Sequence, residues 1–484
     1  MKKLLGSALA LALLVSVGTA NAELLKNFKF GGSVEMSAIS GRNFVNFQKE
    51  AVGGTGAATD RIGDAQTRIM LNMDWDLLDD VHAKITLGKN NQVYGKFGNG
   101  HAAAEDLNTA QTAVMIDQGY FKIDKVFGAI DMTFGRQFYG EPGDLIAYWG
   151  PKYDEYGMDI TAADGARFDY SGEKAYATVL VLTPARVAGD TGTGIIDAEN
   201  GQRLAVRGFI VGNKGNENVD GKVYVWNAAR HGAAVPGATG AAEAKNDNLY
   251  IVGLKAKAKF GGAYGSVEVA KNFGEYRYNP TAGAATGNSG RYAGMAMLIN
   301  AGLKADVEQI GMFNPWAEFG YGSGDGDTPA NDAQNRNFAA IATDYKPGAV
   351  YGRFNANNTG GQTFASGANA ATAGNGLFNR IIWGVGVKAT PTAVNKLTMG
   401  VQFYDFNFQN LLIGPGATAA IAGNRHIGSE VDVTGEWKHS ENVSLKGTIG
   451  NFMPGGYIKN QVNGTVGNHV SSAWLGAMDL AVKF

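Results

Sequence analysis

Apolar and polar side chains alternate with a period of two along most of the chain, in segments of about ten residues. In the last segment, one face carries only aromatic and aliphatic side chains apart from one glycine: Trp474, Met478, Leu480, Val482 and Phe484. The opposite face is mixed in polarity. This alternation predicts β-strands with one apolar face, and a tilted strand needs about ten residues to cross the hydrocarbon of a membrane. The pattern therefore favours strands that span a membrane.

We expect about 18 such strands, within a range of about 16 to 20. The predicted strands cover residues 28–36, 66–75, 81–87, 112–124, 129–138, 166–171, 174–183, 203–212, 220–229, 247–258, 262–272, 291–304, 308–321, 378–389, 396–409, 427–438, 441–452 and 472–484. The connections between them alternate between short turns and long loops. Short periplasmic turns and long extracellular loops are typical of outer-membrane barrels.

A sheet inside lipid must close on itself, because hydrocarbon offers no hydrogen-bond partner to an open sheet edge. The predicted fold class is therefore all-β, a transmembrane antiparallel β-barrel. A closed sheet of about 18 strands is wide enough to leave an aqueous channel inside. The last strand, ending at Phe484, resembles the carboxy-terminal signal by which the outer-membrane assembly machinery recognises barrel precursors.

The beginning of the chain has the pattern of a secretory signal peptide. Lys2 and Lys3 precede an apolar run from Leu4 to Val17, and the small-residue triplet Ala20-Asn21-Ala22 follows. We expect residues 1–22 to be removed and residues 23–484 to form one barrel domain in the Gram-negative outer membrane. Taken alone, the signal peptide fits a soluble secreted or periplasmic protein, so the outer-membrane prediction depends on the alternation.

Composition excludes several classes of function. The chain has no cysteine, which rules out disulfides, thiol catalysis and iron–sulfur or zinc-thiolate sites. Without Lys2 and Lys3, 40 of the 42 basic residues remain against 44 acidic ones, a net charge of −4. Nucleic-acid binding calls for a basic surface, so it is not expected. The six histidines show no metal-ligand spacing, and we predict no metal site and no cofactor.

Three short motifs resemble outer-membrane porins, and most specifically the alginate-export type of porin. They are the segment GAIDMTFGRQ at 128–137, the segment DGARF at 164–168 and the segment GSGD at 322–325. The resemblance implies a barrel of about 18 strands that passes small anionic or polar solutes, such as ions, sugars or uronate chains.

Alternation also assigns charged side chains to the inside of the barrel, because a charge on the lipid face costs a few kcal/mol at mid-depth. The lumen candidates that we select are Arg68, Asp131, Arg167, Asp169, Arg203 and Arg207. Their signs are mixed. One interpretation is that they select solutes, and the other is that they form a solvated wall of compensating ion pairs.

A constriction is expected from the loop at residues 139–163. It carries aromatic rings, Tyr148 and Trp149, beside the carboxylates of Asp144, Asp154 and Glu155. Rings offer a sugar a flat apolar face and carboxylates bond its hydroxyls, but the same residues also suit a loop packed on itself outside the barrel. Residues 322–377 are predicted to form a long extracellular loop, within which 337–356 could instead add a membrane hairpin.

The favoured function is an outer-membrane porin that lets small hydrophilic solutes diffuse through an aqueous channel. A structural sleeve or an adhesin is the alternative. A barrel hydrolase is less favoured and we predict no enzyme, because a hydrolase would need a serine, a histidine and an acidic residue at the extracellular rim. The only histidine on a predicted lumen face, His82, lies beside a periplasmic turn. The expected partners are outer-membrane lipid, the solutes and the barrel assembly machinery; the choice between a monomer and a homotrimer stays open.

Overall fold

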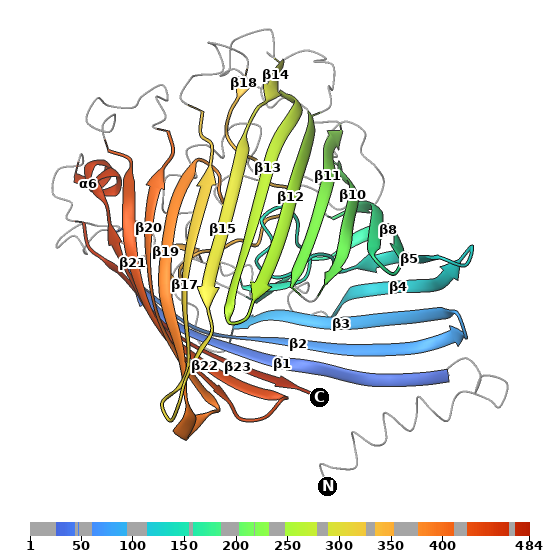
Figure 1. The fold of residues 1–484 in the computed structure, drawn as a ribbon, viewed down its shortest axis with the longest axis horizontal. Helices are drawn as coiled ribbons and strands as arrows, with labels where there is room; N and C mark the ends of the chain where they lie inside the picture. Colours follow the sequence, from blue (N-terminus) through green and yellow to red (C-terminus); the bar gives the residue numbers. More distant parts are fainter. Residues whose placement is uncertain are drawn as a thin grey trace.

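The computed structural model describes the chain in segments (Figure 1). They are residues 26–43, 47, 61–93, 114–153, 158–184, 203–216, 218–231, 247–277, 289–325, 334–352, 376–410, 424–463 and 470–484. The predicted signal peptide at residues 1–22 lies outside them, so its removal remains a prediction.

Eighteen long strands form the wall of the barrel. They are β1 (Lys26–Arg42), β2 (Arg61–Leu78), β3 (Val81–Val93), β4 (Met115–Val126), β5 (Ile130–Gln137), β8 (Ala163–Ser171), β9 (Ala175–Thr183), β10 (Arg203–Asn216), β11 (Val219–His231), β12 (Asp247–Phe260), β13 (Ala263–Arg277), β15 (Met295–Leu303), β17 (Gly311–Gly322), β19 (Arg380–Pro391), β20 (Leu397–Phe408), β21 (His426–Lys438), β22 (Val443–Pro454) and β23 (Ala473–Lys483). Consecutive wall strands pair in antiparallel fashion, as the alternation predicts.

Five further strands are short. β14 (Ser289–Tyr292), β16 (Ala305–Val307) and β18 (Gln334–Asn335) extend the same sheet at its margins, and β6 (Pro151–Tyr153) pairs with β7 (Met158–Ile160) in a separate two-stranded sheet. The helical elements in the described residues that carry labels are η2 (Thr392–Val394) and α6 (Gly456–Asn463). Neither is long and apolar enough to cross a membrane.

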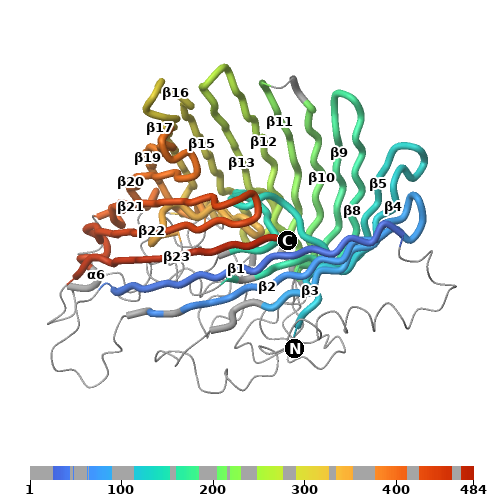
Figure 2. The backbone as a smooth tube through the Cα atoms, turned by 90° about the horizontal axis from the view of Figure 1, so that it is seen from below, coloured from blue at the N-terminus to red at the C-terminus, as the bar shows by residue number. Residues whose placement is uncertain are grey.

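The barrel closes where the first strand meets the last. β1 pairs with β23 in antiparallel register, from Ser33 opposite Lys483 to Arg42 opposite Trp474. Figure 2 shows the two strands side by side. Phe484 completes the seam, because its backbone N–H donates to the Gly32 carbonyl at 3.0 Å and its carbonyl accepts from the Gly32 N–H at 2.9 Å. The prediction of a closed antiparallel barrel is confirmed.

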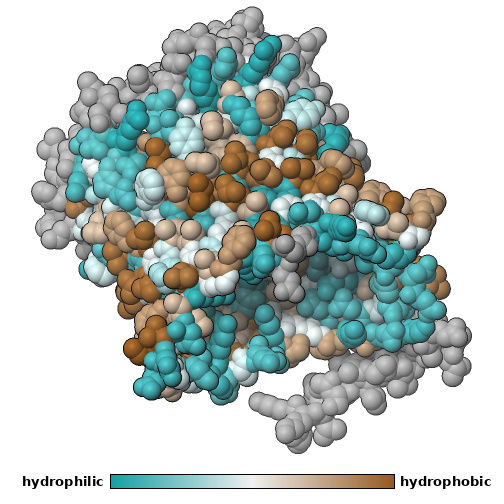
Figure 3. All heavy atoms as spheres, in the orientation of Figure 1, coloured by the Kyte–Doolittle hydropathy of each residue, from teal (hydrophilic) through white to brown (hydrophobic). Residues whose placement is uncertain are grey.

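The outer face of the wall is apolar. Val179, Phe209, Val225 and Val252 lie directly opposite one another on β9 to β12, and each is more than 40% exposed. Such a continuous apolar row suits contact with lipid hydrocarbon. Figure 3 shows apolar side chains over the outside of this wall, and a hollow lined mainly by hydrophilic residues at the end where the short turns lie.

The connections are asymmetric, as expected. A tight turn connects the end of β2 at Leu78 to the start of β3 at Val81. A long loop connects the end of β5 at Gln137 to the start of β8 at Ala163. The strands exceed the predicted length, since β1 has 17 residues and β2 has 18. About ten residues suffice to cross hydrocarbon, so these strands are long enough to extend beyond it.

Candidate functional site

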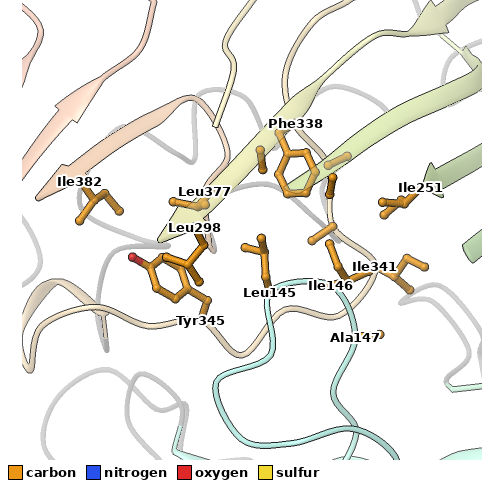
Figure 4. Close-up of a cluster of buried hydrophobic side chains, with 14 of the residues drawn as sticks. Leu145, Ile146, Ala147, Ile251, Leu298, Phe338, Ile341, Tyr345, Leu377 and Ile382 are labelled. Atoms are coloured by element: carbon orange, nitrogen blue, oxygen red, sulfur yellow. The ribbon is translucent and has the colours of Figure 1, made fainter. Parts of the chain in front are cut away.

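Two long loops turn into the barrel and meet in its interior. The first inward loop, described at residues 138–153 and 158–162, joins β5 to β8, and the second inward loop, described at residues 323–325 and 334–352, leads from β17 towards β19. Apolar side chains of both loops pack together and against the wall (Figure 4). The shared cluster includes Leu145, Ile146, Phe338, Ile341 and Tyr345 from the loops, and Ile251, Leu298 and Ile382 from β12, β15 and β19.

Backbone hydrogen bonds join the two loops. The N–H groups of Ile341 and Ala342 both donate to the Ile146 carbonyl at 3.0 Å, and the Tyr148 N–H donates to the Ala342 carbonyl at 2.8 Å. At the edge of the contact, the Asp344 N–H donates to the Asp144 carbonyl at 2.9 Å. Because these bonds satisfy buried backbone groups, the loops form one layer across the lumen.

Side chains of the wall hold the first inward loop. The Lys255 ammonium on β12 lies 2.8 Å from the Asp144 carboxylate, and both side chains are about 15% exposed. On the other side of the lumen, Arg68 on β2 donates to the Lys152 carbonyl at 3.0 Å, and the Met158 N–H donates to Gln66 Oε1 at 3.1 Å. The loop thus spans the lumen from β2 to β12.

Two buried carboxylates on β21 hold the second inward loop. Glu430 accepts hydrogen bonds from the N–H groups of Val350 and Tyr351 at 2.7 and 2.8 Å, and Asp432 accepts one from the Ala349 N–H at 3.0 Å. Both carboxylates are fully buried. Buried polar side chains and buried backbone N–H groups both need hydrogen-bond partners, so these contacts hold the loop in place.

Tyrosines add further anchors. The Tyr345 hydroxyl donates to Glu318 on β17 at 2.6 Å, and Arg380 Nε on β19 donates to the Tyr351 hydroxyl at 2.6 Å. Burial, and then the nearby Glu318 carboxylate, raises the pKa of Tyr345 well above its ordinary value. Burial, and then the Asp344 carboxylate, raises the pKa of Tyr148 to about 12. Both phenols therefore remain neutral hydrogen-bond donors near neutral pH.

The predicted long loop at residues 322–377 follows β17 at the long-loop end of the barrel, and its described part folds inward. Within the described residues 337–352 no strand joins the wall, so neither the outer hairpin nor the membrane hairpin considered for 337–356 is found there. The short apolar pattern of this loop was set by packing, because Phe338, Ile341 and Tyr345 face the first inward loop and the wall instead of lipid.

Several of the selected lumen candidates lie on the inward face of the wall, each beside an opposite charge. Arg68 lies 2.5 Å from Glu35, and Arg167 lies 2.6 Å from Asp169. Asp131 lies 3.1 Å from the ammonium groups of both Lys122 and Lys125. These contacts match the interpretation in which charged lumen residues compensate one another.

Arg207 was assigned to the wrong face. It lies opposite Val181 and Asn227 in the sheet and shares the outward face with Phe209, while Val206 and Ile210 point inward. Here the inward side chains of β10 belong to the buried interior cluster, so apolar residues occur on both faces of the strand. Hydrophobicity alone therefore does not show which residues of β10 face inward and which face outward. Arg203 pairs with His231 in the backbone register, and its side chain is outside the described part of the structure.

In the first inward loop, Tyr148 and Trp149 are only 5% and 4% exposed, so their faces are not open to a solute. Asp144 is held by Lys255. Asp154 and Glu155 lie outside the described residues. Sequence reasoning missed Gln66, Tyr345 and Tyr351, whose partners are far away along the chain, and no local signal marks them.

A charged vestibule lies below the loops, at the short-turn end of β2 to β8. Lys84 lies 3.1 Å from Asp74, and Lys122 bridges Asp124 and Asp131 at 2.6 and 3.1 Å. These side chains are between 19% and 44% exposed, unlike the buried anchors of the second loop. Within the described residues, no group of three or more histidine, aspartate or glutamate side chains could hold a metal ion.

No family model and no curated protein matches the sequence. Solved structures match nearly the whole chain. OpdQ of Pseudomonas aeruginosa has a TM-score of 0.52 at 8% identity, covering 96% of this chain and 99% of its own. OccAB4 of Acinetobacter baumannii has 0.52 at 10% identity, with 96% and 100% covered. The outer membrane protein OprD of Pseudomonas aeruginosa has 0.51 at 8% identity, with 95% and 94% covered.

The chain has the fold of an outer-membrane porin. At these identities the likeness shows the fold alone. The predicted resemblance to porins is confirmed at that level, but the finer resemblance to the alginate-export type is not supported, because these neighbours are OprD and Occ proteins. The three motifs are between four and ten residues long, which is too short to separate one porin type from another.

Proposed function

We propose that this chain forms an aqueous channel in the outer membrane of a Gram-negative bacterium, through which small hydrophilic solutes such as ions and sugars diffuse. The observation that carries the proposal is the contrast between the two faces of the wall. Outward rows such as Val179, Phe209 and Val225 are apolar, whereas the hollow at the short-turn end is lined by charged groups such as Asp74 and Lys84. A lumen that served only for packing would not keep half-exposed charges.

The constriction is assigned to the layer formed by the two inward loops. Their contacts reach β2 through Arg68 and β21 through Glu430, so a solute must pass beside or between them. Asp144 contributes little free charge there, since Lys255 compensates it. The vestibule pairs Asp131–Lys122 and Arg167–Asp169 are balanced too, which favours weak ion selectivity.

Assembly is proposed to depend on the last strand. Trp474, Met478 and Phe484 face outward and are between 44% and 55% exposed, so they are open to recognition before the barrel closes. Leu480 and Val482 continue the same face.

The function is tested by solute flux. Purified protein is reconstituted into liposomes, and the swelling rate is measured in isosmotic solutions of monosaccharides, disaccharides and larger oligosaccharides. We expect swelling that falls with solute size, whereas liposomes with an equal amount of heat-unfolded protein should not swell. Folded, heat-modifiable protein that permits no swelling with any solute would refute the channel.

A further inference from the structure

Aromatic rings on the inner wall lie over glycines of neighbouring strands. A Cβ added to Gly302 on β15 would lie 2.3 Å from Cζ of Tyr264 on β13, and one added to Gly386 on β19 would lie 2.8 Å from Nε1, Cε2 and Cζ2 of Trp316 on β17. Equal distances to three indole atoms mean that the ring lies against the glycine. Each ring therefore occupies the space that a side chain would fill, and rests on the wall.

The two rings belong to one row of the sheet. Tyr264 lies opposite Gly302, Gly302 opposite Trp316, and Trp316 opposite Gly386. The ring-bearing strands are two strand spacings apart, which is about 10 Å. Both rings lean in the same direction around the barrel, so they form a shallow platform with Gly302 between them and Gly386 beyond Trp316.

Rings that cover glycines differ in exposure, and Tyr176, which covers Gly212, is partly exposed as Tyr264 and Trp316 are. What sets Tyr264 and Trp316 apart from Tyr176 is that they share one row of the sheet. Tyr224 covers Gly253 and is 3% exposed, and Tyr404 covers Gly384 and is 7% exposed, so both serve packing. Tyr264 and Trp316 remain partly exposed on the lumen side. Covering a glycine stabilises a strand pair, but it does not require a ring to stay open to water.

Polar groups border the platform. The Tyr264 hydroxyl donates to Asn314 Oδ1 at 2.8 Å, which orients the ring and leaves the amide N–H₂ of Asn314 free to donate elsewhere. Asn300 and Gln402 lie on the same inward face within one or two strands, and both are partly exposed. The Gln402 amide nitrogen donates to Asp432 at 2.8 Å, and Lys388, opposite Asn314 in the sheet, adds an ammonium donor to the same face. Amide oxygens, amide N–H groups and an ammonium set around apolar rings can bond the hydroxyls of a polyhydroxylated ring.

We propose that Tyr264 and Trp316 form a binding platform for the apolar face of a pyranose sugar on the vestibule side of the channel. This deepens the proposed function, because it rests on solutes entering the lumen. The platform differs from the aromatic loop that the sequence singled out, since Tyr148 and Trp149 are buried and cannot stack on a solute. The sugar's ring face packs on the indole or phenol, and its hydroxyls bond the bordering amides.

The test is saturation-transfer NMR on the folded barrel in detergent, with glucose as the ring and sorbitol as an open-chain polyol. This measurement needs no solute flux. For the wild-type protein we expect a saturable signal with glucose and little signal with sorbitol. The glucose concentration at half-saturation should be about threefold to tenfold higher in Trp316→Leu, in Tyr264→Leu and in the double variant than in the wild type. Tyr264→Phe keeps the ring and should retain most of the signal.

The matched control is Trp383→Leu, because Trp383 lies on β19 but faces outward and is 55% exposed. Heat-modifiable migration in gels establishes that each variant is folded. Equal signals for glucose and sorbitol in the wild type overturn the platform without any variant, as do folded platform variants that bind glucose like the control. Glucose binding without liposome swelling would refute the channel alone, and swelling without ring selectivity would refute the platform alone.

Discussion

The Asp144 carboxylate lies 2.8 Å from the Lys255 ammonium, and this pair joins the first inward loop to β12. Lys255 also lies 3.2 Å from Glu268 on β13, so a single ammonium compensates two carboxylates in a site that is mostly shielded from water. Removing one partner of such a site leaves charge without compensation, which costs more than the pair contributes.

We therefore expect Lys255→Met to release the first inward loop more than Asp144→Asn does. The Lys255 variant leaves two carboxylates facing each other, at an expected cost of about 3 kcal/mol, whereas the Asp144 variant leaves Lys255 paired with Glu268. In planar bilayers, Lys255→Met should raise conductance and produce rapid flicker. Conductance equal to wild type in a folded Lys255→Met barrel would exclude the pair as the loop's anchor.

The second inward loop should depend on Glu430. Val350 and Tyr351 bond different oxygens of Glu430, and an amide turns one of these acceptors into a donor. One buried N–H of the loop then loses its partner, at a cost of about 1 to 3 kcal/mol. Glu430→Gln should make the loop accessible to protease in the folded barrel. Glu436→Gln is the control, because Glu436 lies on the same strand at the other end and contacts neither loop residue. Equal cleavage of the two variants would contradict the anchor.

Gly348→Ala should reproduce the effect of Glu430→Gln by a different route. Gly348 has a φ of +79°, and an added Cβ would lie between 2.8 and 2.9 Å from the Glu430 carboxylate. Left-handed backbone strain of about 1 kcal/mol and the collision both oppose the loop's position. Protease access is again the measurement, with Gly435→Ala as the control because a Cβ there meets nothing within 4 Å. A protected Gly348→Ala loop would argue against the geometry.

Balanced charges in the vestibule predict a small selectivity that one substitution can shift. Asp131 compensates Lys122 and Lys125, so Asp131→Asn should move the reversal potential towards anions. The shift should shrink with salt, because the screening length falls from about 10 Å at 0.1 M to about 3 Å at 1 M. Measuring the reversal potential in a salt gradient at both strengths checks this. A shift that is absent at low salt would mean that ions do not pass Asp131.

Deleting Phe484 should lower the amount of assembled barrel without affecting export. Its backbone bonds Gly32 in both directions, and its ring lies 6.3 Å from the Phe30 ring across the seam. Phe30→Ala separates the two roles of Phe484, since it removes the ring contact but keeps the carboxy-terminal signal. We expect the deletion to reduce heat-modifiable protein in membranes more than Phe30→Ala does. Equal reductions would assign Phe484 to seam packing alone.

The alternation of side chains predicted the strands of the wall but not the packing of the inward loops, and both outcomes have the same physical reason. A strand's alternation is set by its two environments, and lipid outside with water inside gives a clear signal at residues such as Met478 and Asp479. Where a loop packs on the inner wall, as at Val206 and Ile210, both faces of the strand are apolar. The alternation then no longer distinguishes inward from outward side chains. Contacts such as Glu430 with Val350 join residues 80 apart, and no short-range pattern encodes them.

Single-channel recording of the wild-type protein in planar bilayers tests the central claim most directly. The account predicts uniform conductance steps with weak ion selectivity, because the wall is closed, the vestibule charges are paired and the two inward loops are fixed between β2 and β21. The contradicting result is an absence of conductance steps from folded, inserted protein, both in the wild type and in Lys255→Met, in which the first inward loop is released.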